Sequence, residues 1–225
     1  LFLLVNIGET AQLSFGAILL VFWQSLRMDM SVAAYFTMLP LLLLAAAEWT
    51  SRRQLIRCIL LVYTVLVQAL ASAVFLVDAF LYPYWGFRLD VSPLMIYAQT
   101  PQEIVNFVRW WELLLVFLLL SLLLLMAIWG SRWFLNAVPK APVQTFSLFW
   151  LLLAGLLILP IRGGLQQIPL RPGDGYFSEK TFANHATVNA VWNVGYSYTQ
   201  WGKTKKQYRF FKDEENQQIL QNLTP

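Results

Sequence analysis

Long runs of apolar residues, separated by short polar segments, dominate the first 161 positions of the chain. Four runs have 17 to 20 residues each: Ser31–Ala47, Cys58–Val77, Leu113–Trp129 and Val143–Ile161. A helix of about 20 residues, rising about 1.5 Å per residue, crosses a hydrocarbon layer of about 30 Å. The four runs are therefore predicted to be transmembrane helices, and a proline such as Pro40 is tolerated inside such a helix.

Three other segments complete the predicted organisation. Leu1–Ile7 reads as the end of a fifth span whose beginning is missing, and Ala11–Leu26 is expected to lie in the membrane interface or to pack at a slant. The apolar runs stop at Ile161. We therefore divide the chain into a membrane domain, residues 1–161, and a polar linker, residues 162–225.

One helix is expected in the linker, over Thr181–Tyr198. Several of its larger side chains recur at spacings of three, four and seven residues and would share one helix face. They are Phe182, Asn189, Trp192, Asn193 and Tyr196. One helix cannot form a soluble core, so this face is expected to pack on the membrane domain or on another partner.

Composition agrees with a membrane location. Hydrophobic residues make up 58% of the chain and charged residues 12%, whereas soluble domains have about 45–50% and about 25%. These values exclude an ordinary soluble globule and a disordered chain. The net charge of +4 is read as membrane topology and lipid contact, not as nucleic-acid binding. The predicted fold class is an all-α membrane protein with about five transmembrane helices, an interfacial helix and a helical extracytoplasmic linker.

Basic residues in the short connections predict the orientation. One set of connections carries Arg52, Arg53, Arg57, Arg132 and Lys140, and the opposite set carries Arg27, Arg88 and Arg109. Cytoplasmic loops are enriched in Lys and Arg, so the first set is expected in the cytoplasm. The linker would then leave on the extracytoplasmic face of the membrane.

The residues themselves offer no recognisable catalytic or metal site. His185 is the only histidine, Cys58 is the only cysteine, and no HExxH, CxxC, GxxxxGK[ST] or GxSxG pattern occurs. Zinc sites usually draw on several His or Cys ligands. We therefore assign neither catalytic nor metal-binding residues to this chain.

Two arginine–aspartate pairs on one predicted side of the membrane carry the strongest chemical signal. Arg27 precedes Asp29 by two positions, and Arg88 precedes Asp90 by the same spacing. One interpretation is that each pair is an ion pair that closes a helix end. The other is that the arginines bind an anionic lipid headgroup, together with Arg162 and Arg171 in the linker.

Three ordered segments carry a resemblance to a known family. They are LRMDMSVAAY from Leu26, YWGFRLDVSPLMIYAQTPQEI from Tyr84, and IRGGLQQIPLRPG from Ile161 followed by YFS and NHATVNAVWNVGYS. Together they resemble the amino-terminal membrane region of sulfatase-like proteins of the lipoteichoic acid synthase type, in the alkaline phosphatase superfamily. The resemblance extends over nearly the whole chain.

The resemblance implies a function for a longer protein. Such enzymes transfer or hydrolyse lipid phosphoesters of the phosphoglycerol type, using a threonine nucleophile and a divalent metal in an extracytoplasmic domain. That domain would follow Pro225, so its catalytic and metal residues cannot be placed on this sequence. The chain would anchor its own carboxyl-terminal catalytic domain beside the membrane lipids. A small transporter or channel and an envelope scaffold protein are the alternative hypotheses.

Overall fold

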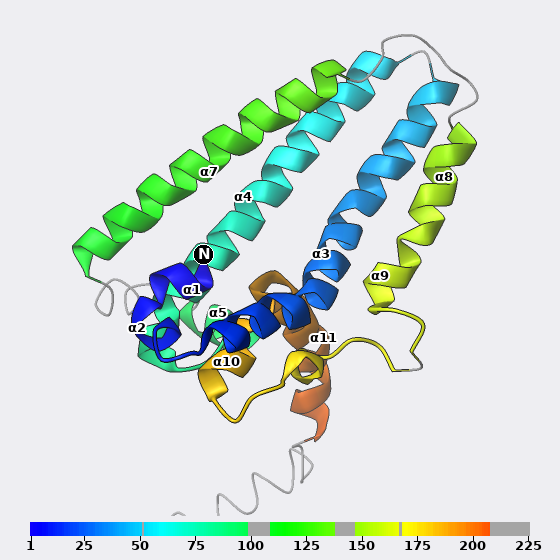
Figure 1. The fold of residues 1–225 in the computed structure, drawn as a ribbon. Coiled ribbons are helices and arrows are strands. Elements are labelled where there is room, and N and C mark those ends of the chain that lie inside the picture. Colours follow the sequence, from blue (N-terminus) through cyan, green and yellow to red (C-terminus); the bar gives the residue numbers. More distant parts are fainter. Residues whose placement is uncertain (51, 99–108, 138–146, 167, 208–225) are drawn as a thin grey trace, which may run out of the picture.

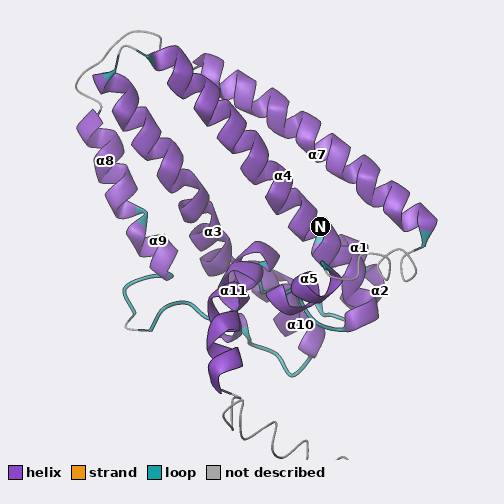
Figure 2. Ribbon diagram, turned by 180° about the vertical axis from the view of Figure 1, so that it is seen from behind, coloured by secondary structure: helices purple, strands orange, loops and turns teal. Residues whose placement is uncertain are grey.

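Helices form every regular element in the part of the chain that the computed structural model describes, which is residues 1–50, 52–98, 109–137, 147–166 and 168–207 (Figure 2). They are α1 (Phe2–Val5), α2 (Ile7–Thr10), α3 (Phe15–Trp49), α4 (Arg53–Trp85), α5 (Val91–Tyr97), α7 (Trp110–Ala137), α8 (Ser147–Leu156), α9 (Ile158–Arg162), the 3₁₀ turn η2 (Pro172–Gly175), α10 (Thr181–Ala186) and α11 (Ala190–Gln207).

The long apolar helices confirm the prediction of an all-α membrane protein. Helices α3, α4 and α7 are long and apolar enough to cross a membrane, and Ser147–Arg162 is a shorter apolar helical segment made of α8 and α9. Helices α3, α4 and α7 contain three of the predicted spans, and α8 and α9 cover most of the fourth, Val143–Ile161, whose first four residues lie outside the described part of the chain. In Figure 1, α4 lies between α7 and α3, while α8 and α9 follow the other side of α3.

The start of the chain differs from the prediction. Leu1–Ile7 contributes to the short helices α1 and α2, not to a spanning helix, and α1 packs on α4. The expected interfacial segment Ala11–Leu26 is not a separate helix, because α3 begins inside it, at Phe15, and continues past Leu26 without a break. The N-cap of α3 is Ser14, whose hydroxyl accepts a hydrogen bond from the Ala17 N–H at 3.2 Å. Figure 1 shows the first turns of α3 crossing the lower end of the bundle before the helix rises beside α4.

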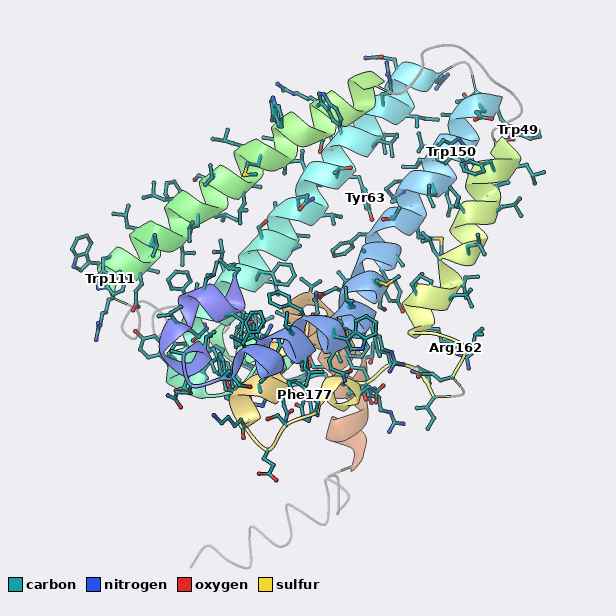
Figure 3. All side chains as sticks on the ribbon, in the orientation of Figure 1. Trp49, Tyr63, Trp111, Trp150, Arg162 and Phe177 are labelled. Atoms are coloured by element: carbon teal, nitrogen blue, oxygen red, sulfur yellow. The ribbon has the colours of Figure 1, made fainter. Side chains whose placement is uncertain are left out.

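The side chains on the long helices α3, α4 and α7 suit a lipid environment. In the most apolar stretch of α7 no residue is buried inside the protein, and Figure 3 shows apolar side chains projecting from α7 and α4. An apolar surface of this length would be unusual on a soluble monomer. Trp49 and Trp111, at opposite ends of the bundle in Figure 3, are exposed, as expected for aromatic residues at the two membrane–water interfaces.

The two ends of the bundle are formed by different elements. The end of α3, the start of α4, the end of α7 and the start of α8 meet at the upper end in Figure 1, whereas α1, α2, α5, α10 and α11 gather at the lower end. Arg52 and Arg57 lie at the start of α4 and Arg132 lies near the end of α7, so all three are at the upper end. This agrees with the prediction that they lie on the same side of the membrane. Lys140 lies outside the described residues.

Candidate functional site

A buried ion pair holds the connection between α4 and α5 at the lower end. Arg88 Nη2 lies 2.9 Å from Asp78 Oδ2, and the two side chains are 6% and 1% exposed. The other oxygen of Asp78 accepts a hydrogen bond from the Leu89 N–H at 2.8 Å. Gly86, in the left-handed region at φ 71°, ends α4 and turns the chain back toward Asp78. The pairing of Asp78 and Arg88 therefore depends on this turn.

Arg88 also joins two distant parts of the chain to α4. Its guanidinium carbon lies 4.0 Å from the centre of the Phe2 ring, and its Nη1 donates to the His185 carbonyl oxygen at 3.2 Å. Burial lowers the pKa of Arg88, and the charge of Asp78 opposes that change. The Nε atom of Arg88 is buried and has no hydrogen-bond partner among the described residues.

The predicted ion pair between Arg88 and Asp90 is not formed. Asp90 is instead the N-cap of α5, and its carboxylate accepts a hydrogen bond from the Ser92 N–H at 2.7 Å. An N-cap carboxylate satisfies a free backbone donor of the first helical turn. The sequence spacing alone could not distinguish this local role from a pair with Arg88.

Arg27 and Asp29 do not pair with each other either, because they lie on a helix and not on a strand. Two helical positions are about 200° apart around the axis, so the side chains point in different directions. Arg27 donates to the Gly163 carbonyl oxygen at 3.1 Å and contacts Gln166. Asp29 accepts from the Asn189 amide at 2.7 Å. Each residue thus ties α3 to a different part of the linker.

The remaining predicted lipid-headgroup residues lie on the surface of the same end. Arg162 is exposed at the end of α9, and Figure 3 places it at the lower edge of the bundle. Arg171 is exposed and precedes η2, where its N–H donates to the Asp174 carboxylate at 2.9 Å. The structure therefore brings the predicted residues to one end of the bundle, with Arg88 buried and Arg27, Arg162 and Arg171 exposed.

The linker helix predicted over Thr181–Tyr198 is two helices, α10 and α11. The break has a local cause: the Asn189 side chain accepts a hydrogen bond from the Trp192 N–H at 3.1 Å and thereby caps the start of α11. Just before it, the Thr187 hydroxyl donates to the Asn184 carbonyl oxygen at 2.7 Å. Asn189 was assigned to a helix face, but its capping role was not recognised.

The predicted face of this segment packs on the membrane domain, as expected. Asn193 donates to the Leu89 carbonyl oxygen at 2.9 Å, and Trp192 Nε1 donates to the Ser31 hydroxyl at 3.3 Å. Trp192 also packs on a small apolar cluster that joins α3 to the linker. That cluster consists of Met28, Leu170 and Val188.

The hydroxyl of Ser197 extends the attachment of α11 to α5, because it accepts from the Val91 N–H at 2.8 Å. On α10, His185 is half-buried and its Nδ1 lies 3.0 Å from the Tyr82 hydroxyl of α4. Burial lowers the pKa of His185, and the charge of Arg88 acts in the same direction. His185 therefore contributes packing and a hydrogen bond to the attachment of α10.

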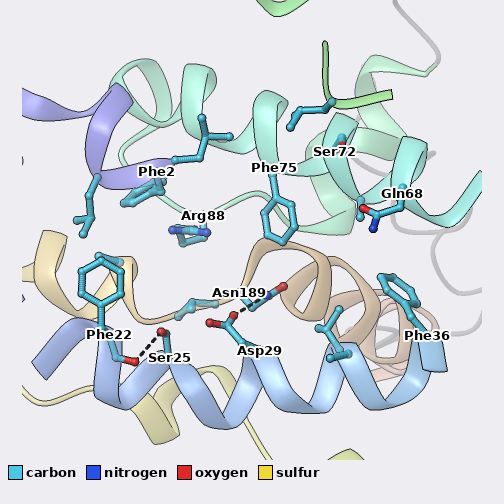
Figure 4. Close-up of a pocket in the computed structure, with 18 of the residues that line it drawn as sticks. Phe2, Phe22, Ser25, Asp29, Phe36, Gln68, Ser72, Phe75, Arg88 and Asn189 are labelled. Atoms are coloured by element: carbon cyan, nitrogen blue, oxygen red, sulfur yellow. Dashed lines mark hydrogen bonds between the residues drawn. The ribbon is translucent and has the colours of Figure 1, made fainter. Parts of the chain in front are cut away.

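A cleft opens between α3 and α4 above this network. Its volume is about 1260 Å³, larger than the roughly 300–1,000 Å³ typical of small-molecule pockets. Most of its lining is apolar, and Arg88 and Asp29 are the two charged side chains that line it. Figure 4 shows these two side chains facing the cleft from opposite walls, with Asn189 bound to Asp29.

Neither the metal-ligating side chains nor the comparisons with known proteins identify a reaction. No group of three His, Cys, Asp or Glu side chains that could hold a metal ion occurs in the described part of the chain. The divalent metal implied by the resemblance therefore has no fitting ligand set among these residues. The chain matches no protein-family model, no curated protein and no solved structure.

Proposed function

We propose that this chain is the membrane-embedded positioning region of a lipid-headgroup phosphoester transferase or hydrolase of the sulfatase-like type. The observation that carries the proposal is the fixed attachment of α10 and α11 to one end of the bundle. Hydrogen bonds join this segment to three separate elements: Asn189 binds α3, Ser197 binds the first residue of α5, and Asn193 binds the turn after α4.

This attachment gives the chain a positioning role. A helix held at several points leaves the bundle from a defined place and in a defined direction, so a domain that follows α11 would be held close to the membrane surface. A lipid headgroup lies at that same surface. Confinement raises the effective concentration of the two reactants, and orientation lowers the entropic part of the reaction barrier. The catalytic chemistry and its divalent metal would belong to the following domain.

The surface arginines supply the lipid contact in this proposal. Arg162 and Arg171 lie exposed at the end of the bundle from which α11 leaves, and Arg27 lies exposed beside the end of α9. Arginine binds phosphate oxygens through two parallel N–H donors. We propose that these residues contact anionic phospholipid headgroups of the extracytoplasmic leaflet of a bacterial cytoplasmic membrane.

Cysteine labelling tests the proposed orientation. In a Cys58→Ser background, Glu179→Cys beside α10 should react with a membrane-impermeant maleimide in intact cells. Arg52→Cys, at the start of α4, should react only after the membrane is opened. The reverse pattern would place the linker in the cytoplasm and would exclude the proposed role.

The coding sequence after Pro225 tests the enzyme assignment separately. A following globular domain that carries clustered acidic, histidine and threonine residues supports the proposal. A stop codon directly after Pro225 would exclude it, even if labelling places the linker outside.

A transport function is the second candidate, because polar side chains of α4 line the cleft. Thr64, Gln68 and Ser72 line it from successive turns of the helix, and Figure 4 labels Gln68 and Ser72. The Thr64 hydroxyl, however, donates to the Leu60 carbonyl oxygen of its own helix at 2.8 Å. Uptake of a solute by vesicles that contain the purified protein, abolished by Gln68→Leu, would favour this candidate over the positioning role.

A further inference from the structure

The part of the cleft that rises between α3 and α4 has the depth of one lipid leaflet. The lining of α3 begins at Ile18, in the first turns of the helix, and from Asp29 it rises to Pro40, while the lining of α4 rises from Phe75 to Tyr63. Eleven or twelve helical steps rise about 17 Å, and half of the hydrocarbon layer is about 15 Å thick. This rising part of the cleft therefore matches the depth of an acyl chain whose headgroup lies near Asp29.

The two charged residues lie at the lower end of this rising part of the cleft and not along it. Arg88 is more than nine-tenths buried, lines the cleft, and has an Nε donor without a hydrogen-bond partner among the described residues. An unpaired buried donor is destabilising. A phosphate oxygen at this position would supply the acceptor that the protein does not. The Phe2 ring, which lies over the guanidinium, would have to move to admit it.

The charges of Arg88, Asp78 and Asp29 indicate which type of lipid headgroup would fit the cleft. The positive charge of Arg88 is already compensated by Asp78. Asp29, by contrast, is bound by the neutral Asn189 amide at one oxygen. A headgroup with both a phosphate and an ammonium would place the phosphate at Arg88 and the ammonium at Asp29. A purely anionic headgroup would place additional negative charge beside Asp29.

We propose that this cleft binds a zwitterionic phospholipid of the phosphatidylethanolamine type, with one acyl chain between α3 and α4 and the headgroup between Arg88 and Asp29. The bound lipid would connect α1, α3 and α4, which line the cleft together. This proposal goes beyond the positioning role and does not require a catalytic domain.

A photoreactive phosphatidylethanolamine with a diazirine on its acyl chain tests the proposal. The full chain is placed in nanodiscs that contain this lipid, and the crosslinked peptides are mapped by mass spectrometry. Crosslinks should concentrate on the cleft walls near Ala33 and Ser72 and exceed those on the outer surface of α7. A uniform distribution over all lipid-facing surfaces would overturn the proposal.

Two variants with matched controls make the test specific. Ala33→Trp, which fills the cleft, should reduce crosslinking about tenfold, whereas Ala46→Trp, exposed on the same helix outside the cleft lining, should not. Asp29→Asn should remove the preference for phosphatidylethanolamine over phosphatidylglycerol in competition, whereas the control Glu179→Gln should retain it. Equal competition by both lipids against the unmodified chain would overturn the headgroup assignment. If Ala33→Trp fails to fold, the crosslink map of the unmodified chain decides the question.

Discussion

Removal of the charge on Asp78 should destabilise the protein much more than an equivalent change at a neighbouring carboxylate. The variant Asp78→Asn keeps a side-chain oxygen that can accept from the Leu89 N–H, but it leaves Arg88 as a buried charge without its partner. The two side chains are 1% and 6% exposed, so the pair belongs to the buried class, in which loss of one partner costs about 3–5 kcal/mol. Exposed pairs contribute only about 0–1 kcal/mol.

A control variant and a double variant show whether the loss of stability comes from the unpaired charge of Arg88 or from the change of side chain alone. Asp90→Asn should cost less than about 1 kcal/mol, because Asn caps helices as well as Asp. The double variant Asp78→Asn/Arg88→Met should recover part of the loss, because a buried charge is no longer left alone. Recovery should be incomplete, since Arg88 also donates to the His185 carbonyl oxygen and contacts Phe2.

Reversible unfolding in bicelles, followed by tryptophan fluorescence, measures these free energies of unfolding. A loss of 3 kcal/mol corresponds to a change of about 100-fold in the unfolding equilibrium constant. An Asp78→Asn penalty no larger than that of Asp90→Asn would refute the buried pair. A double variant that loses the sum of the two single penalties would show that the residues act independently.

Three further outcomes are expected at the attachment of the linker. Gly175→Ala should destabilise the attachment by about 1–3 kcal/mol, because the added Cβ would lie 2.7 Å from the Thr187 hydroxyl; Gly173→Ala, with open space around it, is the unfolding control. Trp192→Ala should cost about 3–5 kcal/mol through loss of its packing, and a smaller loss than that of the Gly175 variant would contradict the packing. Because burial and Arg88 lower the pKa of His185, the detached state binds a proton first as the pH falls below about 6.5. The protection factors of the α10 amides, which are corrected for the pH dependence of intrinsic exchange, should therefore fall between pH 7 and pH 5, and His185→Gln should abolish that fall.

The long apolar runs predicted that the long helices exist, because hydrophobic length is a property of the chain alone, but they did not predict where the helices end. Helix α3 begins at Phe15, whereas the predicted span begins at Ser31, and α4 and α7 each continue eight residues past the predicted ends at Val77 and Trp129.

The prediction of a separate interfacial helix was wrong for a tertiary reason. The polar residues around Arg27 and Asp29 looked like a break in an apolar pattern, but they contact the linker: Arg27 binds Gly163 and Asp29 binds Asn189. A helix can carry polar residues without ending when another segment covers them.

The partners of the charged residues could not be predicted from spacing. Asp78 and Arg88 are ten positions apart and meet only because α4 continues through Pro83 and then ends at Gly86. The number of residues between them does not indicate where the turn falls. The break before α11 was similarly hidden, since Asn189 fits a helix face as well as an N-cap until the Trp192 hydrogen bond is seen. The prediction that this face packs on the bundle was nevertheless confirmed.

Crosslinking between α3 and the start of α11 tests most directly whether the linker is fixed to the membrane domain. In native membranes and a Cys58→Ser background, Asp29→Cys and Asn189→Cys should be joined rapidly by a short bismaleimide, because the two side chains are in direct contact. Asp29→Cys and Tyr198→Cys, with Tyr198 exposed further along α11, form the control pair and should react slowly. Equal rates for the two pairs would contradict the fixed attachment on which the positioning role depends.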